Sequence, residues 1–178
     1  MELLDIVDEN NNLTGEFVDR EIVHSNGLLH REVGVIVLNE NNEILLEKRS
    51  ATKKQSPNKW ALCAGHIEAG DIPENAILRE IKEEIGIDIT EKDLDFLDIF
   101  RRNKKFNNGQ HNNTYIYIYI YRTNKKTEDY TIQLEELSEV KYFPISDIEK
   151  ALEEKDSEYA FYDEPYIKEI LNKIKKRR

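Results

Sequence analysis

Three glutamates on one short segment are the side chains of this sequence best suited to chemistry. Glu83 and Glu84 follow Glu80 by three and four positions, and residues with that spacing lie on one face of a helix. Carboxylates packed together repel one another unless a positive charge lies between them. Oxygen ligands of this kind bind hard divalent cations. The segment therefore predicts a site for Mg²⁺ or Mn²⁺.

A longer pattern surrounds these glutamates. A charge pair such as Glu83-Glu84 alone would favour a solvated helix face, but fixed spacing over residues 65–87 favours a functional motif. The pattern resembles the signature of the Nudix hydrolases: Gly, five residues, Glu, seven residues, then Arg-Glu-aliphatic-x-Glu-Glu-x-Gly-aliphatic. The chain departs from it at Asp71, where the family usually has Glu. The matching positions are Gly65, Arg79, Glu80, Ile81, Glu83, Glu84, Gly86 and Ile87.

The resemblance implies a metal-dependent pyrophosphohydrolase that cleaves a diphosphate linkage in a nucleoside diphosphate derivative. A diphosphate repels anionic nucleophiles, and divalent ions neutralise its oxygens and activate water. The resemblance implies that the three glutamates bind Mg²⁺ or Mn²⁺, with the backbone carbonyl of Ala64 as a further ligand. Arg79 is implied to pair with the first acidic residue of the motif and to orient the helix. The general base varies within the family, so it is not assigned.

Asp71 is one methylene shorter than the usual glutamate, and two roles stay open for it. It keeps the ion pair with Arg79 through a small backbone shift, or it caps the motif helix, because Asp71-Ile-Pro-Glu74 resembles a capping box. We favour the cap with partial pairing. Gly65 and Gly86 are expected to be structural positions of the motif, with Gly86 just beyond the helix end.

Charged side chains outside the motif are further candidates. Lys48 and Arg49 end a predicted strand, at a place where relatives set a basic residue against substrate phosphate, and alternation lets only one of the two face the site. A surface charge is an equal alternative for either. Glu136 precedes Tyr142 by six residues, a spacing similar to that of an additional metal-binding glutamate in some relatives, and a solvated loop carboxylate fits equally. His66 is expected to be structural or solvent-facing and stays outside the catalytic set.

The elements that must position these residues alternate between strands and helices. That order indicates an α/β (α+β) fold with a mixed sheet packed between helices, and the resemblance implies the α/β/α sandwich of Nudix proteins. We expect one domain over 1–178, with an N-terminal extension (1–29), a core (30–155) and a C-terminal helix (156–178). Hydrophobic periodicity predicts strands at 3–7, 31–38, 44–48, 60–64, 94–100, 114–121 and 140–143, helices at 71–86, 146–154 and 164–175, a helical turn at 19–24 and loops at 8–15, 50–58 and 101–113.

Composition narrows the partners. A chain of 178 residues suits one domain with a sizeable core. A net charge of −10 argues against nucleic acid or an anionic membrane as partner. Cys63 is the single cysteine, which fits a reducing compartment, so we expect a cytoplasmic protein. The resemblance implies that its partner is a small-molecule diphosphate. Many Nudix enzymes pair, so the resemblance also implies a homodimer.

Two other functions stay open. Trp60 and Gly65-His66 resemble isopentenyl-diphosphate delta-isomerases, which carry a catalytic Cys directly before that Gly-His. This chain has Ala64 there, and Cys63, one residue earlier, would face the other side of a strand. The other alternative is a catalytically silent, nucleotide-binding Nudix domain, but such domains usually lose motif carboxylates. Substrate choice is expected to lie in the loops at 50–58 and 101–113.

Overall fold

Two strands in the middle of the sheet carry the most regular apolar pattern of the chain. β3 (His30–Leu38) is buried at nearly every position, and β8 (His111–Arg122) contains the alternating isoleucines and tyrosines. The two strands run parallel, with pairs from His30↔Thr114 to Leu38↔Arg122. A strand covered on both faces needs apolar side chains on both, so these two form the centre of the fold. The computed structural model describes residues 1–177, and Arg178 of the expected C-terminal segment lies outside them.

The other strands of the seven-stranded sheet are antiparallel to their neighbours. The order is β5-β4-β3-β8-β7, with β6 also pairing with β3 and β9 with β4. One parallel pair among antiparallel ones makes the sheet mixed, as predicted. The bounds are β4 (Glu43–Arg49), β5 (Trp60–Ala61), β6 (Cys63–His66), β7 (Leu94–Lys105) and β9 (Leu137–Pro144).

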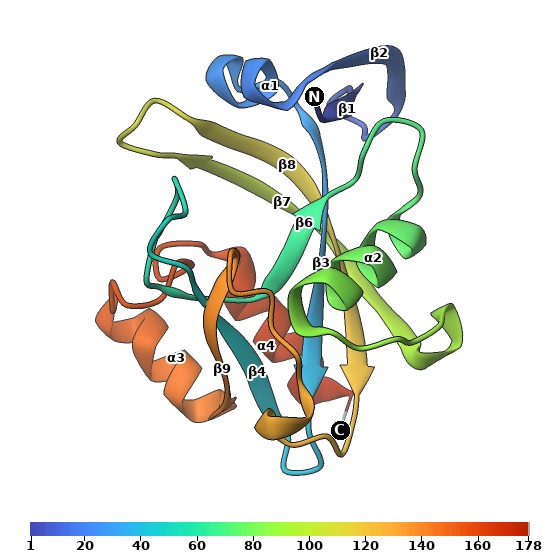
Figure 1. Cartoon of the computed structure of the whole chain (residues 1–178). Helices are drawn as coiled ribbons and strands as arrows, with labels where there is room; N and C mark the ends of the chain where they lie inside the picture. The colour runs from blue at the N-terminus through green and yellow to red at the C-terminus, as the bar shows by residue number, and fades with distance from the viewer. Residues whose placement is uncertain (178) are drawn as a thin grey trace.

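Helices cover both faces of this sheet. α2 (Pro73–Ile85) lies on one side, and α3 (Ile145–Glu154) and α4 (Tyr166–Lys176) lie on the other (Figure 1). Each face has its own apolar core: the valines of β3 pack under α2, while the isoleucines of β8 pack under α3 and α4. The α/β/α sandwich expected from the sequence is therefore confirmed. No helix within residues 1–177 is long and apolar enough to span a bilayer.

The N-terminal segment forms a small unit at one end of the sheet (Figure 1). β1 (Leu3–Val7) pairs with β2 (Leu13–Asp19), and α1 (Arg20–Asn26) packs on them through a separate small core. The helical turn expected at 19–24 is confirmed, but β2 was not predicted. Most of β2 is exposed, so its side chains lack the alternation that marks a half-buried strand, and backbone pairing with β1 defines it instead.

Two predicted boundaries were wrong. Most of the segment 101–113, expected as a loop, is strand: β7 and β8 stay paired out to Lys105↔His111, which leaves a loop of 106–110. These strand ends are polar, so hydrophobicity does not mark them. The single strand expected at 60–64 is two short strands that pair with different partners, β5 with β4 and β6 with β3. Short 3₁₀ turns complete the chain at Glu91–Asp93 and Thr127–Asp129.

Candidate active site

α2 positions the three glutamates of the motif. Its apolar stripe is fully buried against the sheet, which fixes the rotation of the helix about its own axis. Gly86 ends the helix at φ 69°, and a Cβ there would lie 2.6 Å from the Thr131 carbonyl oxygen. Glycine is favoured at such a left-handed helix end. The side of the helix next to the stripe then carries Glu80, Glu83 and Glu84 along one wall of a cavity of ≈ 530 Å³.

These glutamates lack sufficient positive charge around them. Burial, followed by the charges of Glu84 and Glu83, raises the pKa of Glu80 to about 7 despite the neighbouring Arg79. Burial also raises the pKa of Glu84, and its Oε2 atom has no hydrogen-bond partner within residues 1–177. A buried carboxylate in this condition is stabilised by a cation. The donor set therefore fits a hard divalent ion.

Gly65 lets the motif loop approach the helix closely. A Cβ at this position would overlap the Glu80 carboxylate, so a larger residue would push that carboxylate away. Ala64, the preceding residue of β6, is exposed to the same cavity. β6 and α2 thus bring Ala64 and Glu80 to the same cavity.

Arg79 is held by a residue that the sequence analysis missed. Its guanidinium lies 3.1 Å from Glu80 and 3.3 Å from Glu68, and it donates to the His66 carbonyl at 3.3 Å. Asp71 instead accepts from the backbone N–H of Ile72 at 2.8 Å. The helix begins after Ile72 without a side-chain cap, so both roles considered for Asp71, the Arg79 pair and the cap, were wrong.

The N-terminal unit explains why Glu68 takes this place. The Ala69 N–H donates to the Leu3 carbonyl, and the Gly70 N–H donates to Asp5. These two bonds anchor the motif loop to β1 and carry Glu68 toward Arg79. Nothing in the motif itself signals this contact, because it depends on a strand more than 60 residues earlier.

A basic wall faces the glutamates. Arg49 lines the cavity, whereas Lys48 lies over the Trp60 ring at 5.6 Å. Strand alternation thus gives only one of the two to the cavity, as predicted. Lys53, in the loop at 50–58, also lines the cavity and forms an ion pair with Glu136. Glu136 therefore lies at the edge of the cavity, partly exposed and paired with Lys53, and its role as a metal ligand stays a prediction.

A second group of buried charges on the cavity wall is satisfied. Arg102 binds Glu164 through two hydrogen bonds, of 2.6 and 2.8 Å, and donates to Glu32 at 3.1 Å. Thr114 donates to Glu32 at 3.1 Å. Burial alone would raise the pKa of Glu32, but the charge of Arg102, the neighbouring His66 and His30 and the hydrogen bond from Arg102 together outweigh it and hold the pKa at about 2. These residues come from β3, β7, β8 and the segment before α4, so no local motif reveals them.

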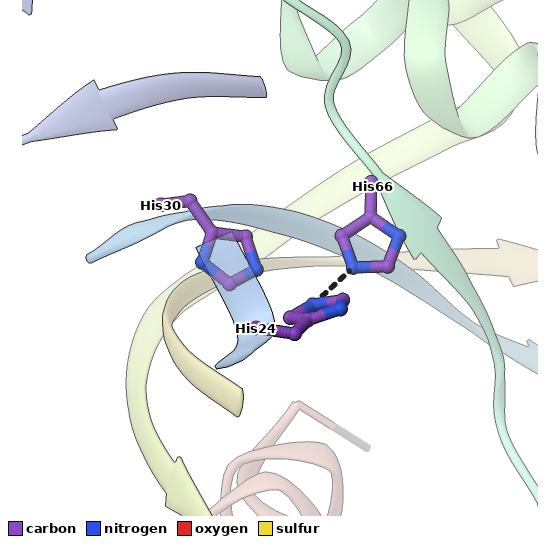
Figure 2. A group of neighbouring side chains, drawn as sticks. All are labelled: His24, His30 and His66. Carbon is purple, nitrogen blue, oxygen red and sulfur yellow. Dashed lines mark hydrogen bonds between the residues drawn. The ribbon is translucent and has the colours of Figure 1, made fainter. Parts of the chain in front are cut away.

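Three histidines meet beside this network, as Figure 2 shows. His24 comes from α1, His30 from β3 and His66 from β6, and one nitrogen of each lies within 4.8 Å of the others. Burial lowers the pKa of all three, that of His24 to about 4, so the rings are neutral at pH 7. Neutral imidazoles are ligands for Zn²⁺ and similar ions.

The histidine group corrects one expectation for His66, whose side chain is 11% exposed and so is not solvent-facing. Its Nε2 atom lies 3.1 Å from His24 Nε2 (Figure 2) and 3.5 Å from Glu32. His30 Nε2 is buried and has no hydrogen-bond partner in the part of the chain that the structure describes. Sequence spacing does not signal the group, because topology alone brings α1 and β6 together.

Comparisons with known proteins give a consistent result. Residues 28–164 match the NUDIX domain model. Nudix hydrolase 3 of Arabidopsis thaliana is 34% identical over 91% of this chain, but the chain spans only 22% of that protein. A Nudix hydrolase of Clostridium acetobutylicum is 31% identical, over 86% of this chain and 75% of its own length. Isopentenyl-diphosphate Delta-isomerase 2 of Photorhabdus laumondii is 36% identical over 49% of each chain.

A crystal structure of a Deinococcus radiodurans protein has the same fold. The two superimpose with a TM-score of 0.69, covering 86% of this chain and 90% of that one. The sequences are 17% identical, so this match concerns the fold alone.

Proposed function

Since this chain belongs to the Nudix hydrolase family, we propose that it is a divalent-metal-dependent pyrophosphohydrolase acting on a nucleoside diphosphate derivative. One observation carries the proposal. Glu80 and Glu84 are largely buried beside each other, have raised pKa values, and face a cavity with basic side chains on its other wall. A polyanionic substrate with divalent cations would neutralise both walls at once.

Each motif residue has a distinct task in this proposal. Glu80, Glu83 and Glu84 hold the metal, and the backbone carbonyl of Ala64 on β6 would be a further ligand. When bound, Mg²⁺ or Mn²⁺ neutralises phosphate oxygens and lowers the pKa of a coordinated water. Arg79 orients the Glu80 carboxylate, which lies 3.1 Å away.

The residues of the basic wall bind the substrate. Arg49 is directed to the cavity and would donate to phosphate oxygens, since a guanidinium matches the geometry of a phosphate. Lys53 is paired with Glu136, and a phosphate would be an alternative partner for it. Release of Glu136 from Lys53 would then allow this carboxylate to join the metal ligands. We place the determinants of substrate choice in this wall and in the loop at 50–58.

The histidine group provides a separate set of ligands. We assign His24, His30 and His66 to a transition-metal ion of the Zn²⁺ type, because nitrogen donors suit such ions better than Mg²⁺. Calorimetric titration with Zn²⁺ tests this assignment. His24→Ala should lose one binding event that the wild-type protein shows, while identical isotherms for the two proteins would contradict it.

The isomerase hypothesis rests on a different observation, the similarity to isopentenyl-diphosphate isomerases over half of this chain. The structure argues against transferring that activity. Ala64 lines the cavity, whereas Cys63 is 2% exposed and packs in the core under α2. The buried thiol does not line the cavity, so hydrolysis remains the favoured function. A silent nucleotide-binding domain is disfavoured because all three motif glutamates reach the cavity.

A phosphate-release screen tests the proposal. The panel contains deoxynucleoside triphosphates, ADP-ribose, nucleotide sugars, coenzyme A, dinucleoside polyphosphates and isopentenyl diphosphate, with coupled phosphatases that convert every product to inorganic phosphate. We expect cleavage of at least one nucleotide class with Mg²⁺ or Mn²⁺, and none with EDTA. Tight nucleotide binding without cleavage would indicate a silent domain. Conversion of isopentenyl diphosphate to dimethylallyl diphosphate would indicate an isomerase.

A further inference from the structure

A second group of buried ligand atoms lies between α2 and the sheet, next to the cavity that Glu84 lines. Glu47 of β4, Cys63 of β6 and Glu84 of α2 each offer one atom, and these atoms lie within 4.8 Å of one another. Glu47 and Cys63 are both 2% exposed. The proposed hydrolytic function uses only Glu84 from this group.

The two carboxylates of the group are not satisfied by the protein. Glu47 Oε1 and Glu84 Oε2 are buried and have no hydrogen-bond partner within residues 1–177. Over the same residues, neither carboxylate forms an ion pair, because Arg49 donates to the Gln55 carbonyl and Lys53 binds Glu136. A buried carboxylate without a partner is costly, and two facing each other are costlier still. Without a cation, a proton held between the Glu47 and Glu84 carboxyl groups and the Cys63 S–H stabilise the group, and a cation can take the place of these protons.

Cys63 decides which ligand fits. Mg²⁺ prefers oxygen ligands alone, whereas Zn²⁺ and Co²⁺ accept a mixture of thiolate and carboxylate donors. We propose that Glu47, Cys63 and Glu84 bind a Zn²⁺-type ion, and that this ion takes Glu84 away from the Mg²⁺ ligands. On binding, the Cys63 sulfur forms a bond to the metal and its proton is released to solvent. The ion reaches the group past Glu84, which lines the cavity.

This site has a consequence for activity that rests on the proposed function. An ion bound by Glu47, Cys63 and Glu84 would remove Glu84 from the ligands of the catalytic metal. Zn²⁺ would therefore inhibit Mg²⁺-dependent hydrolysis, and the inhibition would depend on Cys63. Binding itself does not rest on the proposed function, so the two can fail separately.

Titration of the metal-free protein with Co²⁺ tests the site. A thiolate bound to Co²⁺ gives a charge-transfer absorption in the near ultraviolet that nitrogen and oxygen ligands do not give. The chain has a single cysteine, so the band would belong to Cys63. We expect it to appear in the wild-type protein once Co²⁺ exceeds what the histidine group takes up, and with one equivalent of Co²⁺ in His24→Ala, which alters the histidine group only. Cys63→Ser should abolish it and Glu47→Gln should weaken Co²⁺ binding at least tenfold.

The wild-type protein alone can overturn the inference, whatever the folding of the variants. Absence of the band at saturating Co²⁺, with circular dichroism showing a folded protein, would do so. For the second readout, Zn²⁺ is titrated into the Mg²⁺-dependent reaction, and each protein is compared with its own rate without Zn²⁺. Equal inhibition of wild type and Cys63→Ser would contradict the shared Glu84. If the Co²⁺–thiolate band appears but the protein hydrolyses no substrate of the panel, the proposed function is overturned and the proposed metal site is still supported.

Discussion

The cavity has two acidic walls, and they differ in what balances their charge. On one wall, Glu32 accepts from Arg102 and Thr114, and its pKa is about 2. On the other, Glu80 has burial and two neighbouring glutamates acting against its charge, and its pKa is about 7. Both carboxylates are largely buried, so burial does not separate them. Each has an arginine partner, but Arg79 does not offset burial and the charges of Glu84 and Glu83 at Glu80, whereas the partners of Glu32 together outweigh its burial.

This difference separates two uses of a buried carboxylate. A carboxylate whose partners come from the protein holds elements together, here β3, β7, β8 and the segment before α4. A carboxylate whose partners are missing indicates a site for an added cation. Substitutions on the wall of Glu80, Glu83 and Glu84 should therefore lower activity. Substitutions on the wall of Glu32 and Arg102 should lower stability.

The largest effect should come from Glu84→Gln. The neutral amide keeps the shape but removes charge from the metal ligands, and metal charge stabilisation contributes several kcal/mol to such transition states. At about 1.4 kcal/mol per tenfold, kcat/KM should fall by about three orders of magnitude, while circular dichroism and the urea midpoint stay near wild type. Initial-rate kinetics with the substrate identified in the phosphate-release screen measure the fall in kcat/KM.

The matched control for that substitution is Asp88→Asn. Asp88 lies just beyond the same helix and pairs only with exposed Lys82, an ion pair of a kind worth about 0–1 kcal/mol. Its turnover should remain within about twofold of wild type. Equal loss in both variants would show that a general charge effect, and not the wall of the cavity, governs activity.

The opposite wall should respond through stability. Arg102→Met leaves Glu32 and Glu164 buried without their partner, and breaking a buried pair in this way costs about 3–5 kcal/mol. Urea unfolding of wild type and variant measures the loss. Arg101→Met, at an exposed neighbouring position, serves as the control and should lose less than about 1 kcal/mol. A loss below about 1 kcal/mol in Arg102→Met would refute the structural role of this wall.

A smaller effect is expected from Arg49→Met on the basic wall. Hydrogen bonds to charged groups contribute about 1.5–3 kcal/mol, so KM should rise about 10- to 100-fold with a smaller change in kcat. Lys48→Met is the matched control, because this neighbouring side chain lies over Trp60. Substrate titrations of the two variants compare adjacent residues on opposite faces of β4. A larger rise in KM for Lys48→Met would reverse the assignment.

The smallest effect should come from Asp71→Ala. Its carboxylate neither pairs with Arg79 nor caps α2, so unfolding free energy should change by less than about 0.5 kcal/mol. Glu68→Ala, which removes the carboxylate that does contact Arg79, should have the larger effect on kcat/KM, up to about tenfold. Comparison of these two variants under the same assay shows which acid supports Arg79. A greater loss for Asp71→Ala would restore the usual arrangement of the motif.

The sequence by itself determined the motif helix and the shared face of its three glutamates. Glu80, Glu83 and Glu84 share a face because the period of a helix is a local property, and the same holds for the stripe that turns them to the cavity. Period two likewise predicted β8, and strand alternation correctly separated Arg49 from Lys48. The family signature implied the α/β/α sandwich. Its fixed positions lie in the motif loop and in α2, as the structure confirms.

Tertiary structure alone decided the partners of these residues. Glu68 reaches Arg79 only because β1 anchors the motif loop, and Glu32 meets Arg102 only because β3 and β7 flank β8. The three histidines, and the group of Glu47, Cys63 and Glu84, each join three separate elements. Such contacts depend on how distant segments pair and pack. They have no characteristic spacing in the sequence by which they could be recognised. A local pattern can therefore predict which residues share a face. Only the tertiary structure determines which charged side chains have partners within the protein and which are left for a ligand.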